Sequence, residues 1–189
     1  DNLTDYSGFA RLTTLEAVPN GCFAKTSSVI PGTEQKLEWL PASVKSIGFA
    51  AFQHVCFSYF ALQTSTPITV GNYAFRYNNS LVDFTNGNGG VGILLNLTGT
   101  NVFRDCKALE TLEGLTLAPT NTAIPTGTFR GCSALSDISD IPAQIKSIGD
   151  ASFYGTAVSD LSQIPSSIST IGSDTFLPYD ETFINDLGG

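Results

Sequence analysis

A short motif ending in phenylalanine recurs along this 189-residue chain and constrains its fold more than any other feature. The closest copies read SIGFAAF, TVGNYAF, SIGDASF and TIGSDTF. Copies of the motif, close or loose, end at seven anchor phenylalanines: Phe23, Phe52, Phe75, Phe103, Phe129, Phe153 and Phe176. The spacings between anchors are 29, 23, 28, 26, 24 and 23 residues, and a unit of this size cannot bury its own apolar face. We therefore expect about seven stacked units in one domain over residues 1–189, with 177–189 as a C-terminal cap or the stub of a longer protein.

The segments between the anchors repeat as well. An aliphatic residue followed by Pro stands seven positions before the aliphatic residue of the motif, as in Ile141-Pro142 before Ile148. After the anchor comes a polar or Cys step and then an L-x-x-L pattern. Apolar residues at intervals of three, interrupted by Gly and Pro, do not sustain a helix. We expect short strands and tight turns, with the Gly after the motif's aliphatic residue permitting a corner, and insertion loops near 27–33 and 86–92.

The combined unit is F-x-x-C-x-x-L-x-x-I followed by I-P-x-x-I-x-x-I-G-x-x-x-F, and it resembles the BspA-like leucine-rich repeats of bacterial surface proteins. The match is close from Phe129 to Phe176, moderate from Trp39 to Phe84 and loose elsewhere. The resemblance implies a right-handed, β-rich solenoid with little α-helix and one strand per repeat on its concave side. It also implies export to the cell surface and the binding of host or microbial proteins.

Charge and composition exclude several functional classes. The formal net charge of −8 would be repelled by nucleic-acid phosphates and by anionic lipid headgroups. No apolar run approaches the roughly 18–20 residues of a membrane span, so we expect no membrane insertion of this segment. The chain contains no Met, starts at Asp1 and carries only 14% charged residues. We interpret it as part of an exported protein whose signal segment is absent, and expect an extracellular or cell-surface location.

Neither catalysis nor a metal or cofactor is expected from the residue types present. Cys22, Cys56, Cys106 and Cys132 contain no CxxC pair, and zinc sites need closely spaced ligands. His54 is the only His in the sequence, so no other His can build a His-based triad, and we interpret His54 itself as a residue on an exposed turn. Cys106 and Cys132 share a position in adjacent repeats, which allows either a disulfide or, as we favour, free buried thiols.

A polar position inside the L-x-x-L pattern supplies the candidate binding surface. If the flanking aliphatic residues point inward, these side chains point outward from the strand-bearing face, which solenoids use for recognition. The candidates, named here the acidic stripe, are Tyr59, Asp83, Thr111, Asp137 and Asp160 at this position, together with Glu113 and Asp140 close to it. Aligned carboxylates would favour cationic or hydroxyl-rich ligands or a bound cation, and a merely solvated face is the alternative.

Two functional hypotheses follow from these observations. The first is a non-enzymatic extracellular adhesion scaffold that binds a host or microbial surface protein through its concave face. The second is a carbohydrate-binding accessory module of a larger cell-surface protein or polysaccharide-uptake system, with Trp39 and Tyr59 contacting a glycan. A carboxylate-based glycosidase would need two carboxylates about 5–9.5 Å apart in a cleft.

Overall fold

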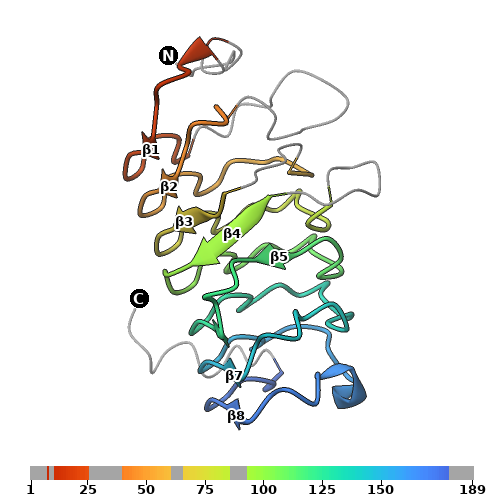
Figure 1. Cartoon of the computed structure of the whole chain (residues 1–189). Coiled ribbons are helices and arrows are strands. Elements are labelled where there is room, and N and C mark those ends of the chain that lie inside the picture. Colours follow the sequence, from red (N-terminus) through yellow and green to blue (C-terminus); the bar gives the residue numbers. More distant parts are fainter. Residues whose placement is uncertain (1–7, 9–10, 26–39, 61–65, 86–92, 179–189) are drawn as a thin grey trace.

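The strands are short and parallel, and they stack one repeat below the next (Figure 1). The computed structural model describes residues 8, 11–25, 40–60, 66–85 and 93–178. One sheet contains β1 (Ala17–Val18), β2 (Ser46–Ile47), β3 (Ile68–Val70), β4 (Leu94–Leu97) and β5 (Thr116–Leu117). A second contains β6 (Ala123–Ile124), β7 (Ser147–Ile148) and β8 (Thr170–Ile171), and the 3-10 helix η2 (Leu161–Gln163) is a single turn. The protein is a β-solenoid with almost no helix, as predicted; the expected loops at 27–33 and 86–92 lie outside the described residues.

The seven anchor phenylalanines form one continuous column of stacked rings, which confirms the predicted phase of the repeat. Successive ring centroids lie 5.3 to 5.8 Å apart, and the angles between ring planes stay between 4° and 23°. The five rings from Phe52 to Phe153 have no exposed surface. Because full burial of one such side chain contributes about 1.5–3 kcal/mol, this column stabilises the contacts between repeats.

Each anchor lies at the centre of a corner that passes twice through the left-handed backbone region. The residue two positions before the anchor has a positive φ in all seven repeats, as at Tyr73 (58°), and the residue two positions after it has one in six, as at Tyr77 (62°). This alternation points the N–H groups of the corner toward the next repeat, so that Phe75 N donates to Val102 O at 3.0 Å. The corner therefore adds a hydrogen-bond ladder that is separate from the strands.

The glycines that follow the motif's aliphatic residues serve close packing between repeats and do not themselves adopt the left-handed conformation of the corner. A Cβ atom on Gly149 would lie 2.7 Å from Thr126 N and 3.0 Å from Ile124 O of the preceding repeat. The N–H of Gly149 donates to Ile124 O at 2.8 Å and extends the strand ladder by one bond. Glycine is required here because two backbones approach closely, whereas the left-handed corner begins two residues later.

The strand ladder of the described repeats is interrupted between β5 and β6. Strand β5 pairs with the first half of β4, and the side chain of Asn121 covers the second half. Its Oδ1 accepts from Leu97 N at 3.0 Å and its Nδ2 donates to Leu97 O at 3.1 Å. The corner ladder continues across this seam, since Phe103 N donates to Thr128 O at 2.9 Å. An amide side chain thus replaces a missing strand, which the sequence analysis did not predict.

The position three residues after the anchor carries buried side chains that form hydrogen bonds. Cys106 Sγ lies 3.3 Å from Phe75 O, and Cys132 Sγ lies 3.2 Å from Phe103 O. Both thiols are free and buried, in line with the favoured interpretation, and burial raises the pKa of the Cys132 thiol well above its usual value. Asn78 in the same column accepts a main-chain N–H instead.

Candidate interaction surface

The acidic stripe follows the L-x-x-L segments of successive repeats. A parallel bridge joins Thr111 to Asp137, and the leucine and isoleucine residues that flank these positions are buried, so the stripe side chains point away from the core. In the stripe, Tyr59, Asp83 and Thr111 are half-buried, and Glu113, Asp137, Asp140 and Asp160 are exposed. Most of its carboxylates are therefore open to solvent.

The stripe does not lie on the strands β1 to β8, contrary to the premise of the sequence analysis. The strands precede the anchor phenylalanines, whereas the stripe position follows them by seven or eight residues, as at Asp137 after Phe129. Figure 1 shows the strands along one side of the stack and η2, whose N-cap is Asp160, on the other side. In the stripe column Thr111 and Asp137 pair through an isolated bridge rather than a longer strand, and a turn follows each of them.

That turn is made by the stripe side chains themselves. Oδ1 of Asp137 accepts from Ser139 N at 3.0 Å and from Ser139 Oγ at 2.7 Å. The same contact to the main-chain N–H two residues on recurs at Asp83, Thr111 and Asp160. Such turns are a common use of Asp and Thr side chains. The sequence analysis missed this structural role, although an Asp followed two residues later by Ser or Thr was its visible signal.

Two carboxylates of the stripe, Asp137 and Asp160, favour the ionised form more than a free aspartate does. The hydrogen bonds from Ser139 and Ser162 favour the ionised form and lower the pKa of Asp137 and of Asp160 below the usual value. Each of these carboxylates uses Oδ1 for the turn, which leaves Oδ2 for contacts outside the chain. The ion pairs within the described residues lie in other columns. The surface can therefore attract cationic groups without first breaking an internal ion pair.

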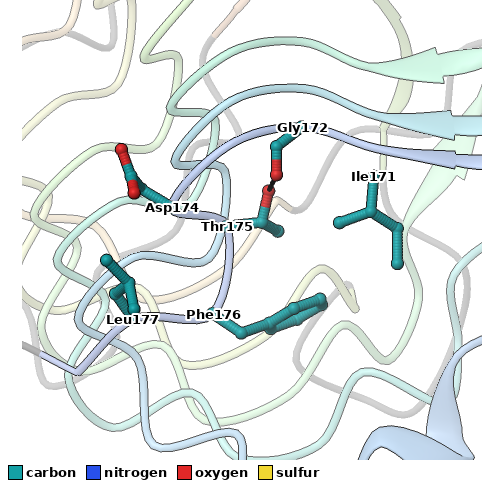
Figure 2. A pocket seen from close by; sticks show the side chains of 6 residues that line it. All are labelled: Ile171, Gly172, Asp174, Thr175, Phe176 and Leu177. Carbon is teal, nitrogen blue, oxygen red and sulfur yellow. Dashed lines mark hydrogen bonds between the residues drawn. The ribbon is translucent and has the colours of Figure 1, made fainter.

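A shallow pocket lies at the end of the described stack. It is lined by Ile171, Gly172, Asp174, Thr175, Phe176 and Leu177. Figure 2 shows that all six residues come from one stretch of chain and that Thr175 Oγ1 bonds to the main-chain oxygen of Gly172. The walls are mostly apolar with one carboxylate, so the pocket lacks the paired carboxylates that a glycosidase needs.

Other reactive groups stay apart in the part of the chain that the structure describes. No three His, Cys, Asp or Glu side chains gather there as a metal site. His54 stacks on the ring of Tyr77, with centroids 4.4 Å apart. Trp39, the residue suggested for glycan contact, lies outside the described ranges. None of the described helices has the length and hydropathy needed to cross a bilayer.

Comparison with known proteins agrees with the repeat geometry. The sequence profile of the BspA type leucine rich repeat region matches in six copies, over residues 12–114 and 96–182. The chain belongs to this BspA-type family. Proteins of leucine-rich repeats are typically interaction scaffolds rather than enzymes. No curated protein matches the chain.

Two solved structures of leucine-rich repeat proteins are similar in fold to this chain. A leucine-rich repeat protein from Bacteroides ovatus superimposes with a TM-score of 0.64 at 21% identity, over 85% of this chain and 37% of that one. The leucine rich repeat protein of T. pallidum gives 0.54 at 19% identity, over 87% of this chain and 81% of that one. This chain thus spans well under half the length of the Bacteroides ovatus protein.

Proposed function

We propose that this chain is an exported, non-enzymatic adhesion module that binds a surface protein of a host or of another microbe through the acidic stripe. In this proposal the stripe takes a basic segment of its partner. The module acts at the cell surface or outside the cell.

One observation carries the proposal: carboxylates recur at the same position of three repeats, with Thr111 at that position in the repeat between Asp83 and Asp137, and the chain holds each carboxylate fixed. Asp83, Asp137 and Asp160 are restrained by their own turns, so a ligand does not have to order them on binding. Exposed pairs each contribute little, but an array of several charges acts together on one partner and speeds its encounter. A repeat scaffold is suited to this use because its surface is extended.

The stripe's turns determine which substitutions test the proposal. Alanine at Asp83, Asp137 and Asp160 would remove both the charge and the turn, so a loss of binding could reflect altered backbone. Asparagine retains an Oδ1 acceptor for the main-chain N–H and removes only the charge. We therefore specify the triple variant D83N/D137N/D160N.

The test measures binding of a fluorescent lysine-rich peptide by anisotropy at low and high NaCl. The expected result is binding that falls with salt and is weakened at least about tenfold in the triple asparagine variant. The matched control, E16Q/D150N/D174N, makes the same change of charge away from the stripe and should retain the original affinity. Equal affinity of the two triple variants would refute the stripe as the binding surface.

A further inference from the structure

Three successive repeats contain the dipeptide Phe-Arg, which places three arginines next to one another on the corner surface. Arg76, Arg104 and Arg130 each follow an anchor phenylalanine and are half-buried. The guanidinium carbon of Arg76 lies 4.3 Å from the ring centroid of Tyr77, and that of Arg130 lies 4.8 Å from the ring of Tyr154. Such contacts hold the planar groups in position. The arginine–aromatic ridge comprises Tyr73, Arg76, Tyr77, Arg104, Arg130 and Tyr154.

One carboxylate of the chain lies among these arginines. Asp105 Oδ2 is 3.5 Å from Arg76 Nε and 3.3 Å from Arg104 Nε. Asp105 stands two residues after its anchor, between the arginine of the preceding repeat and that of its own. The corresponding residue of the next repeat is Gly131, which supplies no carboxylate. Within the described ranges Arg130 therefore has no ion-pair partner, although its surroundings repeat those of Arg104.

Gly131 packs against the Asp105 carboxylate of the preceding repeat. Its φ is +74°, and a Cβ atom there would lie 2.3 Å from Asp105 Oδ1. A larger residue at this position would strain the backbone and displace the Asp105 carboxylate. Position 131 therefore cannot carry the carboxylate that stands at position 105, so among the described residues this corner supplies no ion-pair partner to Arg130.

The neighbouring surface is positive and aromatic although the chain as a whole is acidic. Burial, followed by the charges of Lys25 and Arg76, lowers the pKa of His54. Phe49 is 51% exposed and packs its ring edge-to-face with Tyr73, with centroids 5.7 Å apart. Tyr, Phe and Arg are the residues enriched in the cores of protein interfaces, whereas the Asp and Glu of the stripe are depleted there.

We propose that the arginine–aromatic ridge is a second interaction surface, which binds an acidic segment of a partner protein and pairs a carboxylate of that segment with Arg130. The fork of the guanidinium matches a carboxylate, and the exposed ring of Phe49 and the tyrosines beside it contact the apolar side chains of the segment. The ridge and the acidic stripe have opposite charge, so they select different segments and do not compete. This assignment stands independently of the function proposed for the stripe.

The test uses the full chain and a short fluorescein-labelled peptide rich in Glu and Tyr, with a matched peptide in which Gln replaces Glu. We expect the acidic peptide to bind at low NaCl, the Gln peptide to bind much more weakly, and R130Q to lower the affinity about tenfold. R130K retains the charge without the fork and should lie between R130Q and the original chain. The control K146Q removes an exposed cation from the strand side and should leave the affinity unchanged. Thermal melting of each variant verifies that it folds.

Failure of the acidic peptide to bind, or equal affinity of R130Q and K146Q, would overturn the assignment. An acidic polysaccharide, polygalacturonate, is tested in parallel on the same variants. If it binds in an Arg130-dependent manner while the peptide does not, the ridge recognises acidic sugars and the protein-segment assignment is wrong. The D83N/D137N/D160N variant should bind the acidic peptide normally, which separates this result from that of the stripe.

Discussion

Replacement of Phe153 by alanine tests whether the phenylalanine column holds the repeats together. The ring has no exposed surface and is stacked between Phe129 at 5.3 Å and Phe176 at 5.5 Å. Burial of about 150 Å² at about 25 cal/mol per Å² corresponds to about 4 kcal/mol. The alanine methyl group retains part of this, whereas the loss of two stacked contacts and the cavity add to the cost. We expect a decrease of about 3–5 kcal/mol in the free energy of unfolding.

The assay is urea denaturation followed by circular dichroism, combined with amide hydrogen exchange. Loss of the ring should speed exchange most at Phe129 N and at Phe153 N, which donate to Ser152 O and Thr175 O across the two affected repeat contacts. A uniform increase along the chain would instead indicate that the stack unfolds as one unit.

Two further phenylalanines provide matched controls. Phe176 is half-buried and stacks on one ring among the described residues, so F176A should cost about 1–2 kcal/mol. Phe49 is 51% exposed, and F49A should cost less than about 1 kcal/mol. If F153A lost no more than about 0.5 kcal/mol, or no more than F49A, the column would not be the core and the phase of the repeat would be wrong.

Three other outcomes are expected. N121L leaves both main-chain groups of the last residue of β4 without partners and should cost about 1–3 kcal/mol by urea denaturation; an unchanged midpoint would contradict the seam. G149A should cost about 2–3 kcal/mol because its Cβ meets backbone, whereas G21A, with φ +61° and nothing within 4 Å, should cost about 1 kcal/mol; the reverse order would contradict the close-packing role. By NMR titration, S139A should raise the pKa of Asp137 toward 3.8. The turn of Asp137 stabilises the fold above the unfolded pKa of about 3.9, and this contribution is lost as pH falls through the lower folded value, so an unshifted titration would contradict it.

The parts of the fold that follow from periodicity were predictable from the sequence. The anchor phenylalanines recur at a regular position, and a ring at each of these positions has no alternative to stacking on its neighbours. The role of glycine was harder to predict, because a close approach between repeats and a left-handed corner both favour Gly. The left-handed positions hold residues such as Ala50 and Tyr73, which carry no sequence signal for that conformation.

The seam and the ridge depend on contacts between repeats, which one-dimensional spacing does not reveal. Asn121 falls in an insertion between two units, and its bonds to β4 depend on where the chain crosses the stack. The Phe-Arg dipeptides were visible in the sequence. The ion pairs were not, because Asp105 pairs both with its neighbour Arg104 and with Arg76, which lies 29 positions earlier. The alignment of the stripe residues on successive repeats was predictable from their spacing. Their position away from strands β1 to β8 was not, because the sequence does not distinguish an Asp that forms a turn from an Asp exposed on a strand.

The two hydrogen-bond ladders run in opposite directions. Phe153 N donates forward to Thr175 O of the next repeat, whereas Gly149 N donates back to Ile124 O of the previous one. Each interior unit therefore offers the same donors and acceptors to either neighbour, and excision of one whole unit brings matching edges together. Such an array can change length through duplication or deletion within its gene, and no new complementary surface has to arise. Units on either side of Asn121 are not interchangeable in this way, because their strands belong to two separate sheets and the Asn121 side chain takes the place of a strand between them.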